Sequence, residues 1–164
     1  MRKIPVLFIL IAALPQPAWA ASTCAKSAWG KFVNALVAGQ TAFVRGDPTS
    51  LMELWSHADD VTLMGAWGGY ERGWSQVGPR LEWVSKSAAG GTYSYDEVSS
   101  IVESDLALFV QIEHIAIPSL NSGAPSHLRV THVMRCEGSE WRIVSRHADR
   151  LSETKPPPGV KPLQ

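Results

Sequence analysis

The stretch LRVTHVMRCEGSEWRIVSRHAD, residues 128–149, decides the fold. Apolar residues alternate with polar or charged ones on both sides of the segment EGSE, which is typical of β-strands that pack one face on a core. The four-residue turn at 137–140 joins the two strands as an antiparallel hairpin. The last strand nevertheless ends in several charges, so the function depends on which side chains face inward.

Strand pairing across this turn sorts the charged residues onto two faces. If Cys136 lies opposite Trp141, one face is mostly apolar and also carries two histidines and an aspartate, His132, His147 and Asp149. The other face is basic, and it carries Arg129, Thr131, Arg135, Arg142 and Arg146. A one-residue bulge would exchange these assignments.

Upstream, the apolar residues recur at helical spacing. They predict a first helix from residue 27 to Gly46, and a short second helix that starts at Asp47 and Pro48, where aspartate caps and proline takes the first turn. A third helix spans about residues 74–89; it begins at a Ser75 cap or, because of Pro79, near Gly78.

The remaining segments predict strands. A short strand at 61–64 leads into a Gly-rich hairpin at 66–73, and the chain is strand-like from residue 92 onward. Helices come first and a long antiparallel meander follows. This order predicts an α+β domain, with three N-terminal helices packed on one face of a strongly curved, mostly antiparallel sheet.

The segment LMELWSHADDVTLMGAWGGYERGWSQVGPRLEW, residues 51–83, together with residues 128–149, resembles the nuclear transport factor 2-like superfamily, and within it the SnoaL-like, ketosteroid-isomerase-like domains. The resemblance extends over residues 27–151. It implies a cone-shaped, cystatin-like roll whose bent sheet and helices enclose a pocket, and often a homodimer paired through the outer sheet face. It does not imply a particular reaction, because the superfamily includes enzymes and binding modules.

Ketosteroid isomerase chemistry with the family's own residues is not expected. The resemblance places the general-base aspartate at Gly65, the oxyanion tyrosine near Gly39 and the oxyanion aspartic acid at Thr131. None of the three residue types is present.

The resemblance places Arg146, Thr131 and, with them, Arg129 toward the interior of the cone. Two alternatives follow for these arginines, because an uncompensated buried charge is strongly destabilising. They grip a carboxylate or enolate-like oxygen of a ligand, or they form internal ion pairs with Glu113 or the aspartates at 59–60.

A histidine and an aspartate two residues apart, His147 and Asp149, share one strand face. This pattern fits a general base oriented by a carboxylate, and equally a histidine satisfied at a dimer interface on the outer face, where we expect the pair to lie. Either Glu113 or His114 reaches the pocket, according to register.

Trp67 and Tyr70 lie in the Gly-rich hairpin, and we expect them at the pocket mouth, in contact with a flat apolar ligand. No cluster of histidines and cysteines has metal-ligand spacing, so we expect neither a metal nor another cofactor.

The chain begins with a predicted secretory signal peptide at residues 1–20. Arg2 and Lys3 precede an apolar run at 4–14, and small residues surround a cleavage site after Ala20. The run is too short to span a bilayer, so the protein is expected to be periplasmic or secreted, with no membrane attachment after cleavage. The domain then spans 21–151, and the proline-rich tail at 152–164 is expected to be disordered.

The two cysteines, Cys24 and Cys136, are candidates for a disulfide in an oxidising compartment. The alternative is that Cys136 is a buried thiol. The chain has 15 basic and 15 acidic residues, and this balance argues against a nucleic-acid partner.

The sequence therefore predicts an exported domain that binds a small, partly apolar, anionic molecule. Cofactor-free acid/base chemistry of isomerase, cyclase, hydrolase or dehydratase type would use Arg146 to hold an oxyanion, with His147 or an acidic neighbour moving the proton. The rival hypothesis is a non-enzymic dimerising binding or interaction module.

Overall fold

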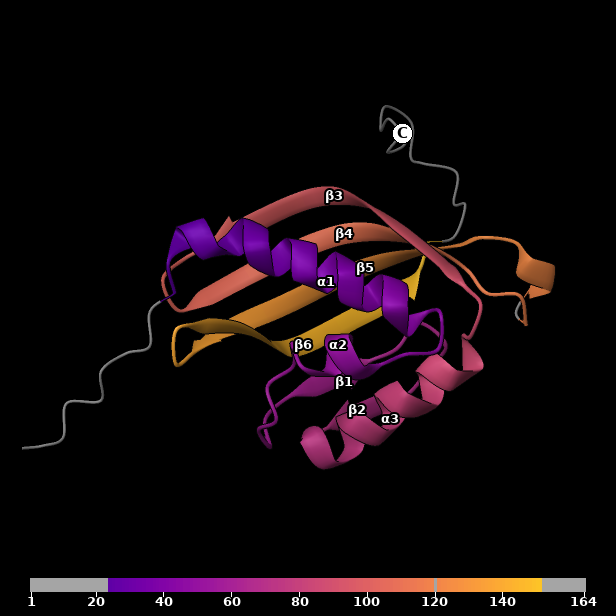
Figure 1. Ribbon diagram of the computed structural model, residues 1–164, viewed down its shortest axis with the longest axis horizontal. Helices are drawn as coiled ribbons and strands as arrows, with labels where there is room; N and C mark the ends of the chain where they lie inside the picture. The colour runs from indigo at the N-terminus through magenta and orange to yellow at the C-terminus, as the bar shows by residue number, and fades with distance from the viewer. Residues whose placement is uncertain (1–23, 120, 152–164) are drawn as a thin grey trace, which may run out of the picture.

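The structure, a computed structural model, describes residues 24–119 and 121–151. The predicted signal peptide and the predicted disordered tail lie outside these residues. The described chain forms a curved sheet crossed on one side by the long helix α1, with α2 and α3 beside it (Figure 1). The α+β fold predicted from the sequence, with helices on a curved sheet, is confirmed.

Three α-helices and two short 3-10 helices make up the helical part of the described residues. The first turn η1 (Lys26–Ala28) leads into α1 (Trp29–Phe43), followed by α2 (Thr49–Met52), α3 (Trp74–Ser87) and η2 (Asn121–Gly123). At the start of α2, the backbone N–H of Thr49 donates to Oδ1 of Asp47 at 3.0 Å, as expected of a capping aspartate. None of the helices in the described residues is long and apolar enough to cross a bilayer.

Helix α3 starts earlier than either sequence expectation. Its N-cap is Gly73, at φ 77°, and Pro79 lies inside the helix. Proline removes the N–H that would bond the carbonyl of Ser75. Ser75 and Pro79 both lie on the exposed side of α3, where water can bind the carbonyl of Ser75 in place of the lost hydrogen bond.

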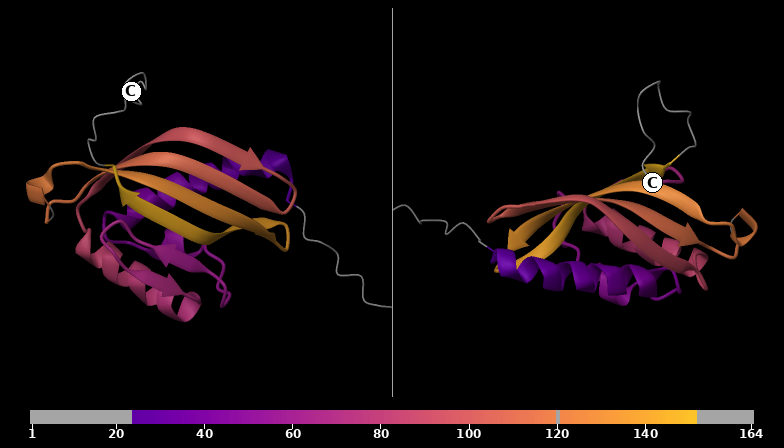
Figure 2. Two further views of the ribbon diagram at one scale, coloured as in Figure 1. Left: turned by 180° about the vertical axis from the view of Figure 1, so that it is seen from behind. Right: turned by 90° about the horizontal axis from the view of Figure 1, so that it is seen from above.

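The sheet has six strands in the order β2-β1-β6-β5-β4-β3. The strands are β1 (Thr62–Met64), β2 (Tyr70–Arg72), β3 (Thr92–Val102), β4 (Leu106–Ala116), β5 (Ser126–Glu137) and β6 (Glu140–Arg150). All neighbouring pairs are antiparallel except β1 and β6, which are parallel. Helix α1 covers one face of the sheet, and none of the helices in the described part of the chain lies on the opposite face of β3–β6 (Figure 2).

A one-residue bulge in β6 changes the expected register. Cys136 lies opposite Trp141 and Met134 opposite Ile143, as predicted. Val133, however, pairs with Ser145, so Val144 is the extra residue. Beyond the bulge, the face that begins with Trp141 and Ile143 continues with Arg146 and Ala148. This is the face that packs under the helices, because Trp141, Ile143 and Ala148 are all buried.

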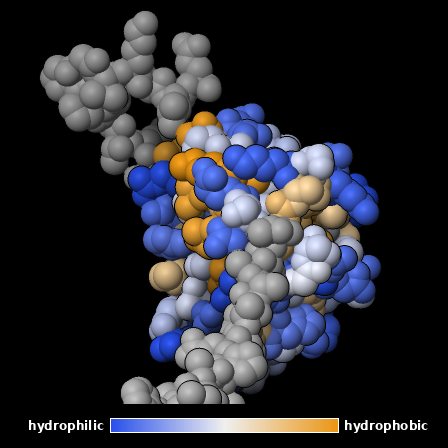
Figure 3. Space-filling view, turned by 90° about the vertical axis from the view of Figure 1, so that its left-hand side faces the viewer, coloured by the Kyte–Doolittle hydropathy of each residue, from blue (hydrophilic) through white to orange (hydrophobic). Residues whose placement is uncertain are grey.

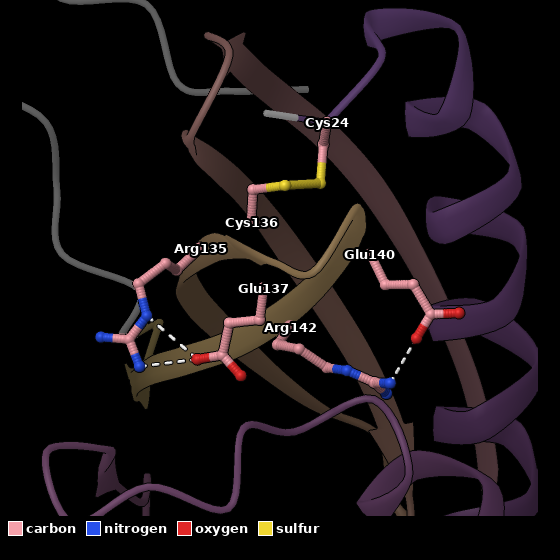
Figure 4. The surroundings of a disulfide bond; sticks show 6 residues. All are labelled: Cys24, Arg135, Cys136, Glu137, Glu140 and Arg142. Carbon is pink, nitrogen blue, oxygen red and sulfur yellow. Dashed lines mark hydrogen bonds and ion pairs between the residues drawn. A yellow bond between two sulfur atoms is a disulfide. The ribbon is translucent and has the colours of Figure 1, made fainter. Parts of the chain in front are cut away.

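A disulfide joins Cys24 to Cys136 over 112 residues of sequence (Figure 4). Both cysteines are buried. The backbone N–H groups of Cys24 and Cys136 donate to the carbonyls of Ser104 and Asp105, so the start of the described chain is fixed to the β3–β4 turn. Arg135 beside it bonds Glu137 and Asp60, and the bond from Arg135 lowers the pKa of Asp60.

Replacing both cysteines, Cys24→Ala with Cys136→Ala, should lower the free energy of unfolding by about 4 to 5 kcal/mol, because the unfolded chain regains the entropy of a loop of this length. Urea unfolding of the oxidised protein and the double variant measures the difference. A reductant should bring the wild type to the level of the variant and leave the variant unchanged. Equal stability of the two oxidised proteins would contradict the prediction.

Candidate functional site

The helices and the sheet enclose a cavity of about 710 Å³. Its walls come from α1, the segment around α2, the β1–β2 hairpin, α3 and the inner faces of β4, β5 and β6. Most lining residues are apolar, among them Phe43, Trp55, Leu81, Ile115 and Leu128. A cavity of this size with mostly apolar walls suits one small organic molecule.

Arg146, on β6, is the arginine that the sheet contributes to the cavity wall. Its Nη2 donates to Oε2 of Glu113 at 2.6 Å, and the two side chains are 14% and 0% exposed. Glu113 lies on β4, and β5 separates it from β6, so the Arg146 side chain crosses β5 to reach it. The internal ion pair with Glu113, one of the two alternatives for Arg146, is therefore present.

Glu113 holds Arg146 from within a buried polar row. Its second oxygen, Oε1, accepts from Nε2 of Gln111 at 2.7 Å, and the same amide nitrogen donates to the Tyr93 hydroxyl at 3.2 Å. Burial, and then the charge of Glu113, raise the pKa of Tyr93 well above its ordinary value. Because Glu113 lies behind Arg146 and both its oxygens accept hydrogen bonds, we interpret it as a residue that positions Arg146.

His132 is a second buried polar group next to Arg146. It lies directly opposite Arg146 across β5 and β6, it is fully buried, and neither ring nitrogen has a hydrogen-bond partner among the described residues. Burial, and then the positive charge of Arg146, hold the pKa of His132 well below its ordinary value. The imidazole is therefore neutral at physiological pH.

Two residues expected in the cone face away from it. On β5, Arg129 and Thr131 alternate with the buried Leu128, Val130 and His132, so they lie on the outer face and their expected inward orientation is wrong. They pair there with Asp149 and His147. Arg129 donates two hydrogen bonds to the Asp149 carboxylate, both at 2.8 Å. Neither residue lines the cavity.

His147 and Asp149 lie on the outer face, as expected. Asp149 is bound to Arg129 rather than to His147, and neither reaches the cavity. Their joint catalytic role remains a prediction that the geometry does not support.

Of the pair Glu113 and His114, it is Glu113 that faces inward. His114 lies on the outer face, where its two ring nitrogens approach Asp96 at 2.8 Å and His127 at 2.6 Å. In the hairpin, Trp67 lines the cavity, whereas Tyr70 is 62% exposed and does not.

The sequence interpretation missed two cavity residues, Glu71 on β2 and Arg80 on α3. Arg80 Nε donates to Glu71 Oε1 at 2.6 Å. The available signal was spacing, since Glu71 alternates with two exposed neighbours and so faces inward, and Arg80 precedes the buried Leu81. Within residues 24–119 and 121–151, no three side chains of His, Cys, Asp or Glu gather closely enough to hold a metal ion.

The three missing ketosteroid isomerase positions have separate structural explanations. Gly39 packs against α2, and a Cβ there would lie 3.1 Å from the Cα of Leu51, so no tyrosine fits. Thr131 lies on the outer face. Gly65 does line the cavity, but it carries no side chain that could act as a base.

A six-stranded curved sheet that encloses a cavity with α1, α2 and α3 defines the nuclear transport factor 2-like class of α+β domains. The chain belongs to the SnoaL-like domain family, whose family model matches residues 33–149. No curated protein matched the sequence.

Solved structures of the same fold agree with this assignment. They include a nuclear transport factor 2-like superfamily protein from Salmonella enterica, with 21% identity, a TM-score of 0.62, and coverage of 82% of this chain and 96% of the other. A candidate dehydratase of the NTF2-like family from Streptomyces avermitilis has 20% identity, a TM-score of 0.64 and coverage of 76% and 95%. A ketosteroid isomerase-like protein from Erwinia carotovora has 16% identity, a TM-score of 0.62 and coverage of 78% and 99%. At these identities the likeness establishes the fold alone.

Arg146→Met should destabilise the fold by about 3 to 5 kcal/mol, because it leaves the carboxylate of Glu113 buried without its partner. The double variant Arg146→Met with Glu113→Gln should recover most of this loss, and urea unfolding measures both. The matched control is Arg129→Met, which breaks the exposed ion pair with Asp149 between β5 and β6 and should cost at most about 1 kcal/mol. A double variant no more stable than Arg146→Met would refute the assignment.

The stability of the fold should decrease below about pH 6.5, because the unfolded chain then binds a proton at His132 that the folded chain excludes by keeping the pKa of this residue low. The decrease should reach up to about 1.4 kcal/mol per pH unit. His132→Leu should remove this component, whereas His147→Gln on the outer face should keep it. Urea unfolding between about pH 7 and pH 5 measures the slopes, and an unchanged slope in His132→Leu would contradict the prediction.

Proposed function

We propose that this protein is an exported SnoaL-like domain that binds one small, partly apolar molecule in its cone, with an oxygen of the ligand bound to Arg146. The observation that carries the proposal is the combination of a mostly apolar cavity of about 710 Å³ with a single arginine on its sheet wall. A guanidinium has five N–H donors. Glu113 is the one described side chain that bonds Arg146, through Nη2.

The proposal of export, to the periplasm or the exterior, is supported by the disulfide between Cys24 and Cys136. Disulfides persist in oxidising compartments and are rare in the cytosol. This agrees with the signal peptide predicted from residues 1–20.

Acid/base catalysis in the cone is a second candidate function, and Glu71 is the residue that favours it. Among the described residues, Glu71 is the one carboxylate that lines the cavity. Its Oε1 is bound to Arg80, while no described residue donates a hydrogen bond to its Oε2. Isomerisation or dehydration without a cofactor needs one group to take a proton and another to stabilise the developing oxyanion. Glu71 and Arg146 would fill these two roles.

The uncharged fluorescent probe N-phenyl-1-naphthylamine tests the binding function. Its fluorescence should rise on addition of the protein, because the apolar cavity excludes water from the dye. Val84→Trp fills the cavity from α3 and should weaken binding by about tenfold or more. The control Val98→Trp adds the same side chain at an exposed position of β3 outside the cavity and should leave binding unchanged.

The alternative is a non-enzymic dimerising interaction module that uses the outer sheet face. That face carries the exposed Arg129 and His147 beside Val98. At the strand ends, Ile101 and Leu106 are also exposed, and the end of the molecule shown in Figure 3 mixes apolar and polar surface. Two results together would favour this alternative over the ligand-binding cone. The protein would sediment as a dimer, and any binding of the probe would be unaffected by Val84→Trp.

A further inference from the structure

Two tryptophans at the mouth of the cavity each lie under an arginine. Trp67 in the β1–β2 hairpin and Trp83 on α3 both line the cavity, and they are 45% and 60% exposed. The guanidinium of Arg150 lies 5.7 Å from the ring centre of Trp67, and that of Arg80 lies 5.3 Å from Trp83. The mouth is thus lined by aromatic faces with a cation over each.

Among the described residues, one arginine at the mouth lacks a carboxylate partner, whereas the arginine at the base has one. At the base, Arg146 is neutralised by Glu113, which is fully buried. At the mouth, Arg80 is paired with Glu71, but Arg150 has no carboxylate partner within 24–119 and 121–151. A ligand anion at Arg146 would approach a buried carboxylate, whereas an anion at Arg150 would meet a cation that no carboxylate of the described residues compensates.

The hairpin turns on two glycines between Trp67, which lies under Arg150, and Glu71, which is bound to Arg80. Gly68 and Gly69 have φ values of 88° and 104°, which favour glycine. A Cβ on Gly68 would have no atom within 4 Å, whereas one on Gly69 would lie 2.7 Å from Arg80 Nη2. Backbone without side chains therefore lies between Trp67 and Arg80.

We propose that this mouth is a subsite for an acidic group, and that the ligand is an amphipathic organic acid. This inference rests on the proposed binding function of the cone. The apolar body of the ligand enters first, an uncharged oxygen such as a ketone or hydroxyl accepts hydrogen bonds from Arg146, and the acid stays at the rim with Arg150 and Trp67. The sequence predicted an anionic ligand held at Arg146. Because Glu113 is buried beside Arg146, we place the acidic group of the ligand at the mouth instead.

Two probes with the same ring skeleton test the inference: 1-anilinonaphthalene-8-sulfonate and the uncharged N-phenyl-1-naphthylamine. At low ionic strength the wild type should bind the sulfonate about fivefold more tightly, as one solvent-exposed charge contact allows. Salt at about 0.5 M should remove most of this preference, because it screens exposed charges. Arg150→Gln should abolish the preference and leave the affinity for the uncharged probe unchanged.

Two further variants locate the charge. Arg72→Gln removes an equal charge from an exposed position of β2 that does not line the cavity, and it should keep the preference. The charge-neutral double variant Arg146→Gln with Glu113→Gln should also keep it. Urea unfolding first establishes that each variant is folded.

The outcomes separate the two proposals. Equal binding of both probes by the wild type, or a sulfonate preference that survives Arg150→Gln, would overturn the acid subsite and leave the ligand-binding cone in place. If the double variant at Arg146 and Glu113 lost the preference for the sulfonate, the acidic group would instead bind at the base of the cone, beside Arg146. Both proposals would be overturned if the wild type bound neither probe, or if Val84→Trp left the binding of both probes unchanged.

Discussion

The buried ion pair between Arg146 and Glu113 is the constraint on which the interior of this domain depends. A guanidinium that is 14% exposed beside a carboxylate that is not exposed at all is stable only while both partners are present. Its position follows from one extra residue, Val144, in β6. Without that bulge, the face of Trp141 and Ile143 would continue with His147 and Asp149, and the cone would have an entirely different polar base.

The location of the bulge has a structural reason. The start of β6 is bound by the segment after α2, where Ile143 exchanges hydrogen bonds with Leu54 and Ser56. Beyond the bulge, β6 pairs in parallel with β1 at residues 145–147. Val144 lies between these two pairings, so the bulge allows one strand to change neighbours while it stays in the sheet. The same change brings Leu63 and Arg146 side by side on the cavity wall.

Local patterns in the sequence identified the elements of the fold but not the register between them. Helical spacing and the turn at 137–140 identified the helices and the last hairpin, because these signals lie within a few residues of each other. The bulge carries no such signal. The inner face was assigned from the family resemblance, and the structure buries the opposite face, that of Cys136 and Trp141, which reversed the expected orientation of Arg129 and Thr131. Arg146 does face the cone, as expected. The assumed inner face and the assumed register were both wrong, and for this residue the two errors cancel. Glu71 was missed because its role depends on Arg80, which lies on another element.

The charges that line the cavity bear on whether the domain is a binder or an enzyme. Arg146 needs Glu113 to be tolerated in the interior. The pair has no net charge, and within it Arg146 remains an oriented hydrogen-bond donor. Such a donor binds a ligand oxygen in the ground state and stabilises it further only if negative charge develops there during a reaction. Proton transfer to the oxygen of Glu71 that Arg80 holds, Oε1, would require this bond to loosen. A ligand acid that attracts Arg80 at the mouth would have this effect, and in that case the recognition of the ligand and the activation of a base would be the same event.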